Sequence, residues 1–144
     1  CRNGKLRPMG TGDVGPFDND TAADWSMKLD EAPADQREAI IRGALTAAID
    51  KEGNVAGIVA DEAIAAAAVV ASQRPGGATI TTPYGPDFLV NGGTLNLPPD
   101  LDGLAVRALD RVLADEEWRT LWVDSADYAE ARVRLLAIRG VLAC

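Results

Sequence analysis

The chain has 144 residues, which is the length of one ordinary domain. Hydrophobic residues make up 47% of it but aromatic residues only 5%, and this composition favours a core of closely packed helices over a sheet sandwich. The formal net charge of −8 argues against nucleic-acid binding, because such binding depends on neutralising phosphates, and it favours basic partners or cations.

The two ends of the chain carry no predicted element. Met9 is the expected natural start, and residues 1–8 are interpreted as a leader or a cloning remnant ahead of a single helical domain over residues 9–144. The two cysteines, Cys1 and Cys144, are the first and last residues. Because chain termini fray, we expect neither cysteine to have a structural role.

The first two helices are predicted from capping and spacing. Thr21 and Asp24 have the spacing of a capping box, so we expect a first helix over residues 21–29 with Trp25 on its buried face. A second helix is predicted over residues 33–53, because proline suits its first position and its apolar residues recur at spacings of three and four.

The third predicted helix covers residues 59–73 and differs from the others. Beyond Asp61 and Glu62 it is apolar on every side, as expected of a helix in the middle of a domain. Its apolar run, residues 63–71, is too short to cross a bilayer, which takes about 20 residues. We therefore expect a cytoplasmic protein without membrane association.

A segment rich in glycine, proline and threonine follows the third helix. Residues 78–82 and 88–97 contain short β-compatible stretches that allow a small hairpin, and the alternative is a long loop. Extended loops in compact domains are often binding elements, so Tyr84, Asp87 and Phe88 are candidate partner-binding residues. The competing interpretation is that the two aromatic rings only attach this loop to the helices.

Two further helices complete the prediction. The fourth begins at Asp100 as its cap, and the last is capped by Asp124 or Ser125. Trp118 and Trp122 are four residues apart and would cover one patch, more plausibly as core than as a cofactor site. The sequence therefore predicts a mostly α-helical single domain of about five helices, with the alanine-rich third helix at its centre.

Several strings resemble a known family. From Met9 the chain reads MGTGDVGPFDNDTAADW, and later LDEAP, PYGPDF and LAVRALDRVL. Together they resemble the bacterial domain-of-unknown-function family numbered 4259, from residue 9 to near residue 143, and GPFDND is the most specific of them. Gly12 stands where members usually carry tryptophan. The family has no assigned activity, so the resemblance implies a compact bacterial domain and no chemistry.

Most catalytic arrangements are excluded by residue type. The chain has no histidine, which removes the commonest general base and metal ligand. It has neither a P-loop nor a GxGxxG motif in a βαβ context. Asp61 and Glu62 are the only carboxylates considered for acid–base work, and they are better interpreted as partners of the helix dipole. The sequence does not decide whether the protein is an enzyme, and the missing catalytic groups favour a protein that is not one.

A carboxylate cluster precedes and enters the first helix. Asp13, Asp18, Asn19, Asp20 and Asp24 could present oxygen ligands to Mg²⁺ or Ca²⁺, although their spacing matches no EF-hand. We interpret Asp18, Asn19 and Asp20 first as turn and capping groups. A metal site at Asp18 and Asp20 is the alternative.

Small size, acidity and the lack of catalytic groups favour a non-enzymatic protein-binding module of the immunity or antitoxin kind, with a basic partner. The alternative is a divalent-metal-dependent enzyme or small-ligand binder that uses the N-terminal carboxylates and the loop from Tyr84 to Phe88. No cofactor is expected apart from Mg²⁺ or Ca²⁺ in that alternative. The oligomeric state is left open.

Overall fold

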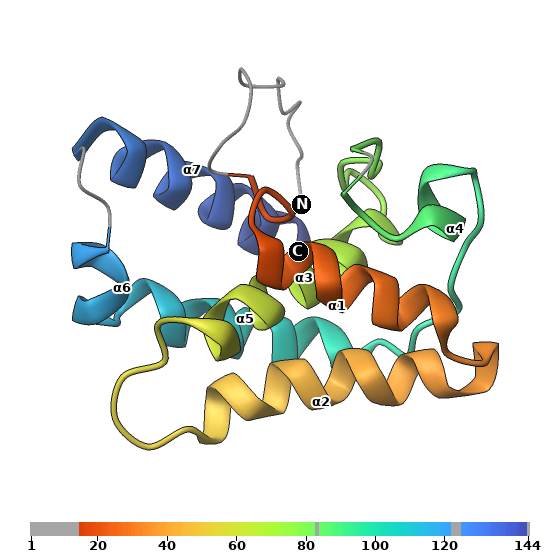
Figure 1. The fold of residues 1–144 in the computed structure, drawn as a ribbon, viewed down its shortest axis with the longest axis horizontal. Helices are drawn as coiled ribbons and strands as arrows, with labels where there is room; N and C mark the ends of the chain where they lie inside the picture. Colours follow the sequence, from red (N-terminus) through yellow and green to blue (C-terminus); the bar gives the residue numbers. More distant parts are fainter. Residues whose placement is uncertain (1–14, 83, 122–124, 144) are drawn as a thin grey trace.

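The computed structural model describes residues 15–82, 84–121 and 125–143, and it is mostly helical (Figure 1). Within these residues it contains seven α-helices, one 3-10 helix and no strand. In chain order they are α1 (Asp20–Glu31), η1 (Ala34–Gln36), α2 (Arg37–Asp50), α3 (Ile58–Ser72), α4 (Asp87–Val90), α5 (Asp100–Leu113), α6 (Glu116–Thr120) and α7 (Ser125–Leu142). The helical class is confirmed, but the predicted count missed the short helices α4 and α6.

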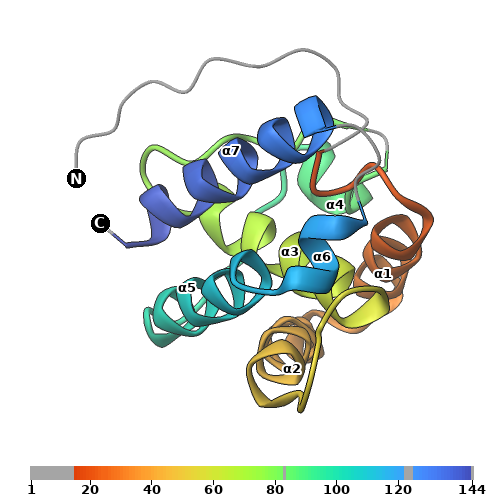
Figure 2. The same cartoon turned by 90° about the vertical axis from the view of Figure 1, so that its left-hand side faces the viewer.

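Helix α3 lies in the middle of the fold, with α1, α2, α5 and α7 around it (Figure 1, Figure 2). Residues 63–71 are all buried. Alanine side chains let neighbouring helices approach closely while leaving few voids. The prediction of a central third helix is confirmed. None of the described helices is long and apolar enough to span a bilayer.

Helix α1 begins one residue earlier than predicted because a different residue caps it. Asn19 has an extended backbone, and its side-chain oxygen accepts a hydrogen bond from the backbone N–H of Ala22 at 2.8 Å. This is the usual N-cap arrangement, so the predicted capping box at Thr21 and Asp24 is wrong. The buried position of Trp25 is confirmed.

The second predicted helix is shorter than expected at both ends. Pro33 precedes the 3-10 turn η1, and the α-helical geometry of α2 starts only at Arg37. At the other end, Arg111 Nη2 donates hydrogen bonds to the carbonyl oxygens of Lys51, at 2.8 Å, and Gly53. The chain beyond Asp50 is therefore held by a side chain from α5 instead of by continued helix.

The expected hairpin is not present, because the described residues of this segment form the short helix α4 and extended loops. The carboxylate of Asp30, in α1, accepts hydrogen bonds from the backbone N–H groups of Asp87 at 2.7 Å and Phe88 at 3.1 Å. Gly92 then ends the helix with a φ of 94°, a conformation that favours glycine. The Asn-Gly-Gly sequence thus ends a short helix, and it makes no hairpin turn within the described residues.

The C-terminal helices follow the prediction more closely. Helix α5 starts at Asp100, but this carboxylate pairs with Arg42 of α2 at 2.7 Å instead of capping its own helix. Trp118 is buried, with its ring edge-on to Tyr128 at 5.9 Å between centroids. The remaining expectations fall outside the described residues or side chains: residues 1–8, Cys1, Asp13, Trp122, Asp124, Ser125 as a cap, and Cys144.

Candidate functional site

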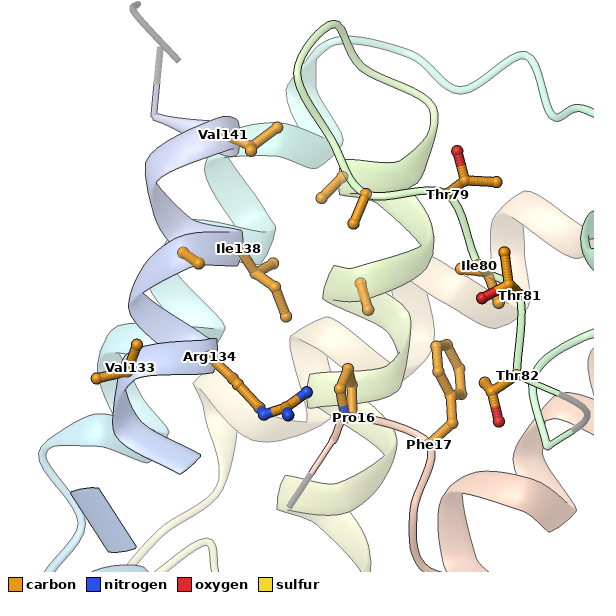
Figure 3. A pocket seen from close by; sticks show the side chains of 14 residues that line it. Pro16, Phe17, Thr79, Ile80, Thr81, Thr82, Val133, Arg134, Ile138 and Val141 are labelled. Atoms are coloured by element: carbon orange, nitrogen blue, oxygen red, sulfur yellow. The ribbon is translucent and has the colours of Figure 1, made fainter. Parts of the chain in front are cut away.

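A pocket of about 480 Å³ lies between α7, α3 and residues 78–82 (Figure 3). Pro16 and Phe17 close one end of it, next to Arg134 and Thr82. The described residues that line it are Pro16, Phe17, Ala68, Ala71, Ala78, Thr79, Ile80, Thr81, Thr82, Val133, Arg134, Ala137, Ile138 and Val141. Segments from the beginning, the middle and the end of the described chain thus form one apolar cavity.

The lining determines what the pocket can bind. Aliphatic and aromatic side chains dominate it, and Arg134 is the one charged side chain among the described lining residues. Arg134 Nη2 donates to the carboxylate of Glu130, one turn earlier on α7, at 3.1 Å. An apolar group with few polar atoms is therefore the ligand that fits this surface.

Helix α7 supplies its wall of the pocket from one face. Arg134, Ala137, Ile138 and Val141 are spaced by three, one and three residues, so their side chains lie along one side of the helix. Ile138 lies on this face of the helix. It is only partly buried, because the pocket opens beside it.

The opposite wall is a single extended segment. Residues 78–82 follow Gly77, where an added β-carbon would lie 1.8 Å from the carbonyl oxygen of Ala71, so only glycine fits this close turn. Ile80 is buried between the exposed Thr79 and Thr81, which is the alternation of a β-strand. Within the described chain, the backbone N–H and C=O groups of residues 78–81 make no hydrogen bond.

The three candidate partner-binding residues do not line this pocket. Phe88 is half-buried beneath the Arg37 guanidinium, with Arg37 Cζ 3.9 Å from the ring centroid. The backbone of Asp87 is held by Asp30, as described above. Tyr84 is exposed and is the one of the three that offers a large apolar surface to a partner. The loop interpretation thus stays a prediction, centred on Tyr84.

Among the N-terminal carboxylates, Asp18 takes part in a hydrogen-bonded turn. Asp18 Oδ2 accepts a hydrogen bond from the N–H of Gly15 at 3.0 Å, and Asp18 N–H donates to the carbonyl of Gly15 at 3.1 Å. Asp20 is exposed in the first turn of α1, where the helix dipole favours negative charge. The described residues contain no group of three or more His, Cys, Asp or Glu side chains that could hold a metal ion. The metal site at Asp18 and Asp20 stays an untested prediction.

Asp61 lies in the first turn of α3 and Glu62 directly follows it, and neither residue lines the pocket. Burial raises the pKa of Asp61 from its ordinary value of 3.8 to about 6, and the neighbouring charge of Glu62 adds to this effect. Raised carboxylate pKa values are common at functional sites, but they also arise at helix starts that are packed against a core. Asp61 therefore has a predictable effect on stability whether or not it has a further role.

Replacing Asp61 with asparagine is expected to change how stability depends on pH. Because the folded chain binds a proton at Asp61 more readily than the unfolded chain, the wild type gains stability from this group as the pH falls from about 7 towards 4. Asp61→Asn lacks this gain, so its melting temperature should exceed that of the wild type above pH 6, and the difference should shrink below it.

Melting curves at pH 4.5, 6 and 7.5 measure this difference. Asp50→Asn, at the exposed end of α2, is the matched control for the loss of one negative charge. A difference between Asp61→Asn and the wild type that stays constant over the three pH values would contradict the assignment.

Comparison with known proteins gives one match. No curated protein and no solved structure matches the chain significantly. A family model matches residues 10–134, which include Pro16, Phe17, residues 78–82 and Arg134 of the pocket. The chain belongs to the family described as "Domain of unknown function (DUF4259)".

Proposed function

We propose that this domain is a non-enzymatic protein-binding module, of the kind represented by immunity proteins and antitoxins. Its binding site is the pocket between α3, α7 and residues 78–82. One observation carries the proposal: an open apolar cavity borders an extended segment whose backbone hydrogen-bonding groups are unused within the described chain. An extended peptide can satisfy such a backbone while it places a side chain in the cavity.

The chemistry of the pocket supports binding over catalysis. Its described lining offers threonine hydroxyls and one guanidinium, but no carboxylate, and the sequence contains no histidine. Acid–base or nucleophilic catalysis needs a positioned base next to the reacting group. The described lining can therefore bind a ligand, but it holds no side chain that could act as a general base.

A small apolar molecule is the competing ligand class. The volume of about 480 Å³ lies within the range of small-molecule sites. The unused backbone of residues 78–81 favours the peptide, because a peptide backbone can exchange hydrogen bonds with these groups and a small apolar molecule cannot. The net charge of −8 further favours a partner with basic residues around its apolar anchor.

Ala137→Trp is expected to weaken peptide binding by about tenfold or more. Ala137 is half-buried on the α7 wall, so an indole at this position would fill space that the side chain of the ligand needs. Excluding one apolar side chain from a pocket removes about 1.5–3 kcal/mol, and each 1.4 kcal/mol is a factor of ten in affinity. Panning a random peptide display library on the whole chain, followed by titration of the selected peptides, measures this change.

Ala129→Trp is the matched control, because Ala129 lies on the same helix but is exposed and does not line the pocket. It should bind the selected peptides as the wild type does. The proposal is wrong if the library yields no peptide, or if Ala137→Trp binds the selected peptides as tightly as Ala129→Trp. A panel of small apolar molecules that raise the melting temperature when no peptide binds would favour the competing class.

A further inference from the structure

We propose that two copies of this chain associate through the outer face of α7, which forms an antiparallel pair with α7 of the second copy. The proposal goes beyond the proposed function, because it concerns another face of this helix and a partner that is the same chain. An exposed apolar face, its match with its own reverse and the distribution of charge carry the inference.

The outer face of α7 is apolar although it is exposed. The residues that α7 buries in the core are Ala131, Leu135 and Leu142. Six other residues recur at spacings of three and four on the side of the helix away from the core, and all six are exposed. This outer stripe consists of Ala126, Ala129, Val133, Leu136, Gly140 and Ala143. The helical pattern continues to Ala143, whose N–H donates to the carbonyl of Arg139 at 2.8 Å.

The outer stripe has the pattern of a helix that packs against a second helix. Alternating spacings of three and four residues are those of the seam of a coiled coil. Its two large members, Val133 and Leu136, are 52% and 38% exposed and lie about one turn apart. Figure 1 and Figure 2 show α7 at the edge of the fold, with the other described helices on one side of it only. A helix laid along the outer stripe would remove both large side chains from water.

The outer stripe matches its own reverse. Along the chain its side chains are small, small, large, large, small and small. In an antiparallel pair, Val133 of each copy would lie opposite Leu136 of the other, and the four smaller residues would meet one another at the two ends. Small side chains there let the two helices approach closely. An interface with twofold symmetry requires such self-complementarity, which favours a second copy over an unrelated helix.

The charges along α7 favour the antiparallel direction. Asp127 and Glu130 lie near the start of the helix, and Arg139 lies near its end. An antiparallel pair brings Glu130 of each copy to the level of Arg139 of the other, and it also opposes the two helix dipoles. On the flank where Arg132 of one copy approaches Arg139 of the other, Asp110 binds Arg139 at 2.6 Å and offsets its charge.

The net charge of the chain limits where two copies can meet. Each copy carries a formal charge of −8, so their acidic surfaces repel one another. Among the described α-helices, α7 is the one with a positive sum of ionisable side chains. Its three arginines exceed the two acidic residues Asp127 and Glu130 by one. Repulsion between two copies is therefore smallest at this helix.

Sedimentation equilibrium of the whole chain under reducing conditions tests the association. The reductant prevents Cys1 and Cys144 from joining two copies covalently. The wild type should change from monomer to dimer between about 10 μM and about 500 μM chain. Added salt should strengthen the dimer, because it screens the repulsion between two acidic copies. A wild type that stays monomeric over the whole range would overturn the proposal.

Leu136→Lys should weaken the dimer by at least about tenfold, because it places two ammonium groups in the apolar centre of the pair. Met27→Lys is the matched control, since Met27 is a large exposed apolar residue on the outer side of α1. Both variants make the net charge less negative by one, so a change in overall charge cannot explain a difference between them. Equal dissociation constants for the two variants would contradict an interface at the outer stripe.

Disulfide formation between differently labelled chains tests the direction of the pair. With Cys1 and Cys144 changed to serine, Ala129→Cys and Gly140→Cys are made in separate chains. The antiparallel pair places these two positions opposite each other, whereas two copies of the same position would lie about 16 Å apart along the helix. The mixture should form the mixed disulfide at least about tenfold faster than either chain joins to itself. Faster joining of like chains would overturn the antiparallel pairing.

The outcomes separate this inference from the proposed function. Leu136 does not line the pocket, so Leu136→Lys should bind the selected peptides as the wild type does. A monomeric wild type together with peptides whose binding depends on Ala137 would reject the dimer and retain the binding module. A dimer that Leu136→Lys dissociates, without any peptide that depends on Ala137, would reject the binding module and retain the dimer.

Discussion

Trp25→Ala is expected to lower the free energy of unfolding by about 3–5 kcal/mol, the range for deleting a large aromatic side chain from a packed core. Trp25 lies on the face of α1 that meets α3, and its side chain is 2% exposed. The surrounding core consists largely of alanine, valine and leucine. Small neighbours have little freedom to refill a cavity of this size, so the loss should lie at the upper end of the range.

Urea unfolding followed by circular dichroism measures this loss. Met27→Ala is the matched control on the same helix, because Met27 is 55% exposed and should lose no more than about 0.5 kcal/mol. If Trp25→Ala does not fold, Trp25→Leu retains part of the volume and should give a smaller loss of the same sign. Equal losses for Trp25→Leu and Met27→Ala would show that α1 does not dock through this face.

The long helices could be predicted from the sequence because each carries its own periodic pattern. The apolar character of residues 63–71 on every side was sufficient to place α3 at the centre. The short helix α4 could not be predicted in this way. Its first N–H groups are satisfied by Asp30, which lies 57 residues before Asp87, and local sequence carries no sign of such a contact.

The pocket was missed for a related reason. Its walls come from residues 16–17, α3, residues 78–82 and α7, and none of these segments is unusual alone. Two signals were available: the strand-like alternation around Ile80, and the apolar residues Ile138 and Val141, which are three residues apart on the last helix. Of the residues proposed from the sequence, Asp18 is engaged in a turn and Phe88 in a contact with Arg37. These contacts give both residues structural roles.

Arginine side chains connect the helices at their ends. Arg37 donates hydrogen bonds to the carbonyls of Leu29 and Asp30 at the end of α1, both at 3.0 Å, and Arg111 holds the chain after α2. Carbonyls at helix ends and in loops lack intrahelical partners, and a guanidinium can satisfy two of them at once. Arg74 makes the most extensive set of such contacts, and it connects the end of α3 to the start of α5.

Replacing Arg74 with methionine is therefore expected to lower the free energy of unfolding by about 2–4 kcal/mol. Arg74 Nε donates to both carboxylate oxygens of Asp102, at 2.8 and 3.1 Å. Its Nη2 donates to the carbonyls of Leu97 at 3.2 Å and Pro98 at 3.0 Å. Methionine preserves the apolar part of the arginine side chain. It leaves one carboxylate and two carbonyls without their donors, and the side chain of Arg74 is only 19% exposed at this site.

Arg139→Met is the control that separates this network from an ordinary surface ion pair. Within the described part of the chain the Arg139 side chain bonds only to Asp110, at 2.6 Å, and the two side chains are 37% and 50% exposed. Its loss should cost no more than about 1 kcal/mol, because solvent screens exposed pairs. The midpoints of urea unfolding, compared at an unchanged m-value, measure the loss of stability in both variants.

Arg74→Lys should behave more like Arg74→Met than like the wild type. An ammonium group cannot reproduce the planar guanidinium that reaches Asp102 and the two carbonyls together. Similar losses of unfolding free energy for Arg74→Met and Arg139→Met would contradict the inference that Arg74 holds the end of α3 to the start of α5.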